Sequence, residues 1–303
     1  MSEKFASSAL DDADDAIVGL LEVDGRLTHR EIAERIGLSR SAAAARVQRL
    51  LDEGHVAVRG VAHPAVLGRD ALAHVALVVR GSAVEVARAA ADREDTTFVS
   101  LVTGRHSVVV EVRTAGVVQT EAAVAELRDL AGVDGVDTLV YTEVVRDVAG
   151  PVGAVTVEVD DVDRALLRVL QDDGRASYVR LGEEVGLSAA GARRRVLRLV
   201  EGQAVRVGAV VRHTGRGRRT ATGVGIRLTG DARELLDRVV GLPSLIFAAR
   251  SLGRYDAVLT VSAGTSAQLV EVLDDLRALP GVRDVETWGH LEFVKESYAS
   301  VRL

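Results

Sequence analysis

The sequence predicts an α+β protein made of two tandem copies of one unit, each a winged helix-turn-helix followed by a ferredoxin-like βαββαβ domain. Two observations carry this prediction. Gly-Leu-Ser occurs at residues 37–39 and again at 186–188, and the same shift of about 149 residues aligns much of the chain without a gap. Within each copy, segments with a helical period come first, and alternating strand and helix patterns follow.

Composition limits the function classes. The 303 residues are 48% hydrophobic and 27% charged, which is ordinary for globular domains, and only 3% aromatic, so the cores are expected to be aliphatic. The absence of cysteine excludes disulfides, thiolate metal sites and cysteine nucleophiles. The first residues do not resemble a signal peptide, and no apolar run approaches the ~20 residues that span a bilayer. We therefore expect a cytoplasmic protein.

Three short helices are expected at the start of each copy. Asp11, Thr28 and Ser39 are suited to be N-caps, and Gly37 provides a tight turn before the third helix. A tight turn before a third helix with small and basic side chains is typical of a helix-turn-helix. The expected helices cover residues 11–23, 28–36 and 39–52 in the first copy and 161–170, 177–185 and 188–200 in the second.

Positive charge gathers on the third helix of each copy, although the net charge of the chain is −6. Residues 188–219 carry many arginines against one acid, Glu201, and the first copy is less basic. Small side chains at 42–45 would let the backbone approach a DNA groove, and arginines would meet phosphates and base edges. The alternative is a plain three-helix bundle with a solvated basic face. The candidate DNA-binding residues are Arg40, Ser41, Arg46, Arg49, Ser188, Arg193, Arg194 and Arg198.

The second part of each copy reads strand-helix-strand-strand-helix-strand, which predicts an antiparallel sheet with two helices on one face. The other face is rich in Val and Leu, so we expect it to pack against the sheet of the other copy. The expected elements are 71–79, 82–93, 96–102, 107–113, 117–130 and 134–145, then 220–228, 231–240, 245–252, 256–262, 266–279 and 283–293. The expected domains are winged helix-turn-helix units at 1–63 and 149–212 and ferredoxin-like effector units at 64–148 and 213–303.

These motifs, in this order and spacing, resemble the Lrp/AsnC (feast/famine) family of regulators over nearly the whole chain, twice. The resemblance implies a sequence-specific DNA-binding transcriptional regulator whose chain is a covalent pseudo-dimer. It would read two unlike half-sites one helical turn, or a multiple, apart. It also implies a small-molecule effector, such as an amino acid, and further homo-oligomerisation. The motifs are Leu10–Asp14, Gly37–Ser39, Arg46–Leu50, Val159–Asp163, Gly186–Ser188, Arg195–Leu199 and Leu279–Val282.

The effector site is expected at a Gly-x-x-Asp loop between the second and third strands of the effector unit. The second copy carries Gly253-Arg254-Tyr255-Asp256, where by resemblance the aspartate would hold an amino group. The first copy has Ser107 in place of the aspartate, which puts an ordinary amino-acid site there in doubt. The alternative is that both loops are β-turns that need glycine. The candidate effector-binding residues are Gly253, Tyr255, Asp256 and Gly104.

No enzyme, metal site or cofactor is expected. The seven histidines lack metal-ligand spacing, and no nucleophile, base and orienting acid recur together. One rival is an enzyme, because siroheme decarboxylases look similar to this fold. They use histidine-rich and aromatic segments around the second and third strands, where this chain offers only His106 and Tyr255. Another rival is an effector-binding or assembly module that has lost DNA binding.

Overall fold

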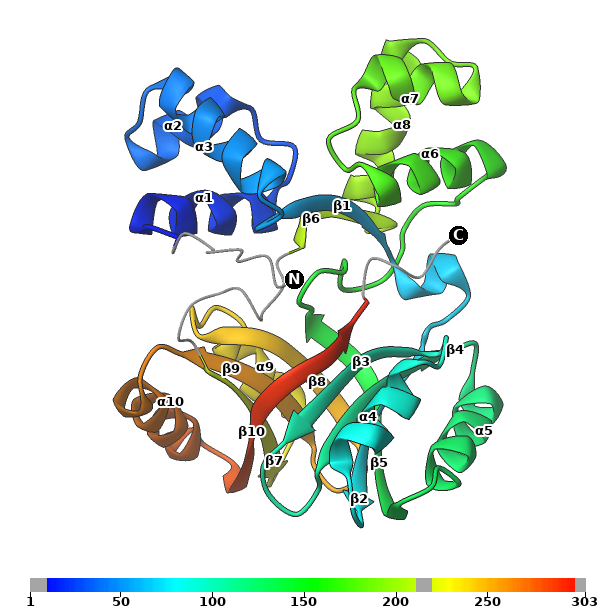
Figure 1. Ribbon diagram of the computed structural model, residues 1–303, viewed down its shortest axis with the longest axis vertical. Helices are drawn as coiled ribbons and strands as arrows, with labels where there is room; N and C mark the ends of the chain where they lie inside the picture. The colour runs from blue at the N-terminus through cyan, green and yellow to red at the C-terminus, as the bar shows by residue number, and fades with distance from the viewer. Residues whose placement is uncertain (1–9, 211–219, 298–303) are drawn as a thin grey trace, which may run out of the picture.

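The computed structural model describes residues 10–210 and 220–297, so part of the basic stretch, 211–219, lies outside the described residues. Two three-helix units lie side by side above a β-barrel that is flanked by helices (Figure 1). The first and second halves of the chain contribute one three-helix unit and half of the barrel each. The α+β class and the tandem arrangement are confirmed.

The three-helix units follow their local sequence signals closely. The Asp11 side chain accepts a hydrogen bond from the Asp14 backbone, and Thr28 and Ser39 cap the next two helices in the same way. Gly37 has a left-handed φ of 72° at the end of the second helix, which a residue with a side chain rarely adopts. The helices are α1 (Asp12–Val23), α2 (His29–Ile36) and α3 (Arg40–Asp52), then α6 (Asp161–Asp172), α7 (Tyr178–Val185) and α8 (Ala189–Glu201).

The wings are exchanged between the two copies. Each copy supplies one wing strand, β1 (Ala57–Ala62) or β6 (Val205–Val210), and these two strands pair with each other in antiparallel register. Strand β1 contacts α6 of the other copy, and β6 contacts α1. One hydrophobic core therefore runs through both three-helix units. The wing expected within each copy is instead shared, because pairing satisfies strand edges that a lone wing would expose.

Each half of the barrel has the expected βαββαβ order, after a short 3-10 turn, η1 (Pro64–Leu67), in the first copy. The helices cover the outer faces of the sheets, and one aliphatic core lies beneath each pair (Figure 1). The first half contains β2 (Ala71–Val79), α4 (Ala83–Ala91), β3 (Thr96–Val102), β4 (Val108–Thr114), α5 (Val117–Arg128) and β5 (Val133–Arg146). The second contains β7 (Thr220–Leu228), α9 (Ala232–Val239), β8 (Leu245–Leu252), β9 (Ala257–Ala263), α10 (Ser266–Ala278) and β10 (Val282–Glu296).

The two sheets join at both edges. Strand β5 pairs with β8, and β10 pairs with β3, so the order β10-β3-β4-β2-β5-β8-β9-β7 closes on itself. The register shifts in both joining pairs mark bulges, which bend a long strand from one sheet into the next. The sheets therefore face each other, as expected, and their edges are also hydrogen-bonded. The inner faces enclose the interior of the barrel.

Candidate DNA-binding and effector sites

The third helices carry their exposed arginines at different positions. On α8, Arg193 and Arg194 are exposed, whereas their equivalents on α3 are Ala44 and Ala45. On α3, Arg40 and Ser41 in the first turn are exposed, whereas their equivalents on α8 are alanines. The opposite faces of both helices are buried in the shared core. The two helices thus present unlike surfaces to solvent. The buried anchors are Ala43, Val47 and Leu50 on α3 and Ala192, Val196 and Leu199 on α8.

The remaining predicted DNA-binding side chains have partners within the protein. Ser188 accepts a hydrogen bond from the Gly191 backbone (3.1 Å), so its hydroxyl caps α8. Arg198 pairs with the buried carboxylate of Asp163 on α6. Arg193 is exposed but also borders a groove of about 1160 Å³ between the three-helix units and the barrel. Among the described candidates, Arg40, Ser41 and Arg194 lie most openly.

Arg46 and Arg49 anchor α3 to α1. Arg46 Nη1 lies 2.8 Å from a carboxylate oxygen of Asp14 and 2.8 Å from one of Asp11, and Arg49 Nη2 lies 2.6 Å from Asp14. The Asp14 side chain is only 3% exposed. Burial acts to raise the pKa of its carboxyl, but hydrogen bonds from Arg49 and Arg46 outweigh burial and leave this pKa below its ordinary value. These two arginines therefore stabilise the helix pair, a role that helical spacing alone does not reveal.

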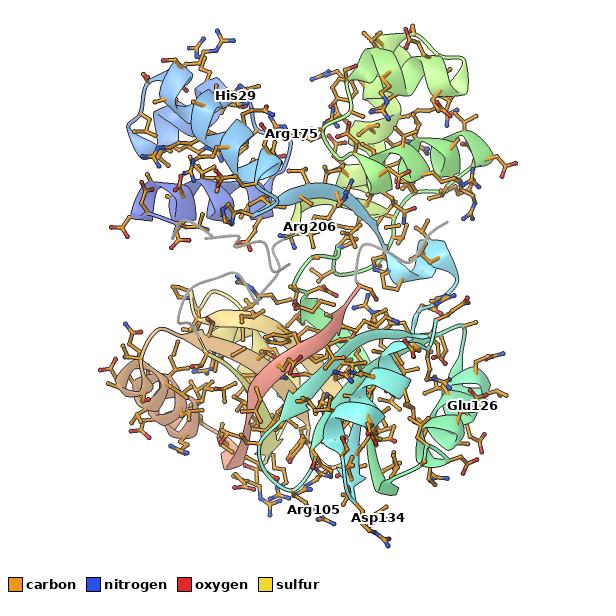
Figure 2. All side chains as sticks on the ribbon, viewed as in Figure 1. His29, Arg105, Glu126, Asp134, Arg175 and Arg206 are labelled. Atoms are coloured by element: carbon orange, nitrogen blue, oxygen red, sulfur yellow. The ribbon has the colours of Figure 1, made fainter. Side chains whose placement is uncertain are left out.

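A reciprocal pair of arginines, here called the arginine clasp, joins the two three-helix units. Arg26 donates to the carbonyl oxygen of Gly174 (2.6 Å), and Arg175 donates to that of Gly25 (2.7 Å). Each guanidinium also reaches a second carbonyl of the same loop, and Arg26 lies over the Tyr178 ring, 4.5 Å from its centre. Figure 2 places Arg175 between the units. The clasp and the pairing of β1 with β6 fix the position of α3 relative to α8.

The predicted effector loops meet at the end of the barrel opposite the helices, where Figure 2 shows Arg105. Gly104 of one copy and the buried Tyr255 of the other line the same cavity. Gly253 has a φ of 139° and lies against Leu139, so its conformation and its close contact both require glycine. Asp256 does not line this cavity. Its carboxylate accepts a hydrogen bond from the Leu228 backbone (2.7 Å), which makes it a turn residue.

Sequence reasoning missed other residues of this cavity. His74 and Trp288 lie at its inner end, with ring centres 5.6 Å apart, and come from different copies. Burial lowers the pKa of His74 to about 4, so this imidazole is uncharged at neutral pH. At the mouth, Arg254 pairs with Glu286 (2.7 Å) and Asp137 (3.5 Å). The only available signal was that Trp288 and His74 align with a leucine and a glycine in the other copy.

Two kinds of site are absent from residues 10–210 and 220–297. This part of the chain contains no group of three or more His, Cys, Asp or Glu side chains that could hold a metal ion. No helix within it is both long and apolar enough to cross a membrane.

Models of two families match the chain. The AsnC-type helix-turn-helix domain matches residues 10–51 and again 159–200, and the Lrp/AsnC ligand binding domain matches residues 223–300. The chain is 29% identical over 140 residues to the HTH-type transcriptional regulator FL11 of Pyrococcus furiosus, covering 46% of this chain and 93% of that protein. It is 26% identical to the proline dehydrogenase transcriptional activator of Rhizobium radiobacter, covering 48% and 98%. These relatives correspond to about half of this chain.

Among solved structures, the siroheme decarboxylase NirDL matches 94% of this chain and 93% of its own, with a TM-score of 0.64 and 13% sequence identity. At that identity the likeness concerns the fold alone. The two helix-turn-helix matches, the ligand-binding-domain match and the regulators that cover half of the chain agree with the repeat seen in the sequence. The chain belongs to the Lrp/AsnC family of transcriptional regulators, in a tandem-duplicated form.

Proposed function

We propose that this regulator binds one DNA duplex through α3 and α8 and reads two unlike half-sites. The observation that carries this proposal is the difference between the two exposed helix surfaces. Arg40 projects from the first turn of α3, whereas Arg193 and Arg194 project from the second turn of α8. Arginines at different turns would meet different bases or phosphates in the major groove. The operator is therefore expected to be asymmetric.

The test begins with an operator selected from a random DNA library by the full chain. Arg193→Ala/Arg194→Ala should lower operator affinity about tenfold or more and reduce the slope of log K against log salt by about 2, one for each lost phosphate contact. Arg40→Ala should lower it less, because only one arginine is removed. Arg30→Ala is the control, since Arg30 is exposed on α2 and pairs with Glu34 (2.8 Å). Equal losses for Arg40→Ala and the double variant, or a flat salt response, would contradict the proposal.

The two helices also permit an exchange experiment. Ala44→Arg/Ala45→Arg gives α3 the arginines of α8, because these positions are equivalent in the two copies. When combined with Arg40→Ala and with Ser41→Ala, it makes the two recognition surfaces alike. We expect this variant to prefer a symmetric operator that repeats the α8 half-site. Continued preference for the original asymmetric operator would show that these side chains do not read the half-sites.

We also propose that an amino acid or similar small molecule modulates DNA binding through the effector units, and that the chains assemble into homo-oligomers in the cytoplasm. Support for the effector comes from the ligand-binding-domain match over residues 223–300. Light scattering with and without each of the common amino acids, beside operator binding, tests both points. A monomeric chain whose DNA affinity responds to none of them would overturn both.

A second candidate is a siroheme decarboxylase-like activity. It is favoured by the fold likeness to NirDL and by the groove of about 1160 Å³, which is bordered by Arg26, Arg146 and Arg206 and has room for a large anionic ring. Against it, none of the described residues that line this groove is a histidine, so a proton donor would have to be Tyr178 or a carboxyl group such as that of Glu31. Porphyrin absorbance of the purified protein and carbon dioxide release from siroheme test this candidate directly.

A further inference from the structure

The interior of the barrel holds two small cavities that gather most of the aromatic side chains of an aromatic-poor chain. Each has a volume of about 50 Å³, and both are lined by His74, Val109 and Trp288. The rings of His74 and Trp288 therefore form the partition between the two cavities. The aromatic residues that line one or both are Phe98, Tyr141, Phe247, Tyr255, Trp288 and Phe293.

The cavities connect the two ends of the molecule. The first opens toward the loop that carries Arg105, at the end of the barrel away from the three-helix units (Figure 2). The second shares Val148, Ile246 and Phe293 with the large groove beneath those units. A molecule inside the barrel would thus touch side chains that also face the DNA-binding end.

This interior is a single composite site, because the two copies have diverged at its centre. Trp288 stands where the first copy has Leu139, and Gly223 stands where it has His74. A Cβ atom at Gly223 would overlap the Trp288 ring, so this glycine makes room for the indole. A Cβ at Gly225 would likewise lie 2.6 Å from the Tyr255 ring. A homodimer would carry two equal half-sites here, whereas the duplicated chain carries one.

The groups at the centre are uncharged, and one of them lacks a partner. Trp288 Nε1 is buried without a hydrogen-bond acceptor among the described residues, and a buried donor without an acceptor destabilises the fold. Tyr141 Oη lies 3.3 Å from Nδ1 of the neutral His74. Arg254 and Glu111, near the cavities, are already in ion pairs within the protein, whereas Arg105 lines only the first cavity, from an exposed loop. The centre suits a neutral ligand that offers an acceptor, and not a zwitterion.

We propose that the barrel interior binds one uncharged, ring-bearing small molecule, whose carbonyl oxygen or ring nitrogen accepts a hydrogen bond from Trp288 Nε1. This goes beyond the proposed amino-acid effector, because it gives the barrel interior a separate, uncharged ligand whose binding requires no DNA. Each cavity is smaller than the apolar cavity of about 150 Å³ that accepts benzene. The ligand therefore occupies both cavities, and the His74 or Trp288 ring turns to admit it.

Trp288 is the only tryptophan of the chain, so its fluorescence reports on this site directly. The full-length protein is titrated with benzamide and acetophenone as neutral probes, and with benzoate and L-phenylalanine as charged counterparts of similar size. We expect a saturable change in Trp288 emission with at least one neutral probe, and binding at least tenfold weaker for both charged compounds. Calorimetry provides a second measurement of the same affinities.

Two variants test whether the ligand binds inside the barrel. Val109→Phe fills both cavities and should abolish the response, whereas Val270→Phe, on the exposed face of α10, makes the same change outside and should leave it intact. Should Val109→Phe fail to fold by circular dichroism, Trp288→Phe removes the donor together with part of the indole ring system and should weaken binding at least tenfold in calorimetry.

Several outcomes would overturn the proposal. The first is no saturable binding of either neutral probe, which would leave ordered water as the occupant of the cavities. The second is equal binding of the charged and the neutral compounds. The third is undiminished probe binding by a folded Val109→Phe variant. Operator affinity is measured on the same preparations. Intact DNA binding with no probe binding would reject this inference and leave the proposed DNA-binding function standing.

Discussion

The arginine clasp should contribute measurably to the free energy of unfolding, because it joins the two three-helix units. Arg26→Ala removes two hydrogen bonds from a charged donor, to the Gly174 (2.6 Å) and Ala176 (2.9 Å) carbonyl oxygens, and the contact over Tyr178. Hydrogen bonds from charged groups contribute about 1.5–3 kcal/mol each, and an exposed cation–π contact about 0.5–1 kcal/mol. Arg26 is only partly buried, which favours the lower end of these ranges. We expect a loss of about 3 kcal/mol in the free energy of unfolding.

The assay measures stability and geometry separately. Urea denaturation followed by far-ultraviolet circular dichroism gives the stability change. Operators whose two half-sites are moved apart one base pair at a time give the spacing preference. Wild-type protein is expected to have a narrow optimum, because clasp and wings hold α3 and α8 at a fixed distance. Arg26→Ala should bind the optimal operator more weakly and tolerate a wider range of spacings.

Arg180→Ala is the matched control, since this arginine is exposed on α7 and its pair with Asp173 (3.0 Å) faces solvent. Arg26→Lys should not restore the stability or the spacing preference, because an ammonium group lacks the planar, forked geometry with which a guanidinium reaches two carbonyl oxygens. A wild-type denaturation midpoint together with a wild-type spacing profile for Arg26→Ala would refute the reasoning. A stability loss with an unchanged profile would assign the spacing to the β1–β6 pairing alone.

Three further predictions follow from single side chains. Burial lowers the pKa of His74 from 6.5 to about 4, so the folded state resists a proton that the unfolded chain accepts. The free energy of unfolding should therefore fall by about 3 kcal/mol as the pH drops from about 6.5 to about 4. In urea denaturation across this range, His74→Phe should lack this part of the pH dependence. Arg49→Ala should lower the free energy of unfolding by leaving the buried carboxylate of Asp14 underpaired, while Arg40→Ala should change only operator affinity; the reverse pattern would make Arg49 a DNA contact. Asp256→Ala should lose about 1 kcal/mol with its hydrogen bond to the Leu228 backbone, yet leave the Trp288 response to a neutral probe intact; loss of that response would place Asp256 in the ligand site.

The sequence predicted the helices because the interactions that start each helix lie within a few residues of one another. The caps at Asp11, Thr28 and Ser39 lie within three residues of the backbone groups that they satisfy, so the sequence alone locates each helix start. The exchange of the wings and the closure of the barrel depend on strand pairs that are distant in sequence, such as β3 with β10, whose paired residues are at least 188 positions apart. Strand patterns indicate which residues face inward, but they do not choose between two possible partner edges.

The sequence does not show which arginines of the third helices are exposed, because arginines on one helix look alike in sequence. Arg40 and Arg49 both lie on the basic helix α3, and the position of Asp14 is what separates the exposed arginine from the anchor. Comparison of the copies offers a signal for this. The acid–arginine pair of Asp14 and Arg49 recurs as Asp163 and Arg198, which is typical of a shared structural need. Exposed arginines without an arginine at the equivalent position point instead to a function that differs between the copies.

Comparison of the two copies also indicates what a duplicated chain can do that a homodimer cannot. Features that both copies retain, such as Arg26 and Arg175, form the frame that joins the halves. The differences between the copies include two places where a ligand would be read, the exposed faces of α3 and α8 and the barrel centre, where Trp288 replaces Leu139 and Gly223 replaces His74. In a homodimer, any substitution appears twice and cannot make one half-site unlike the other. A covalent pair is free of this constraint, so an asymmetric operator would orient the chain in one direction on DNA.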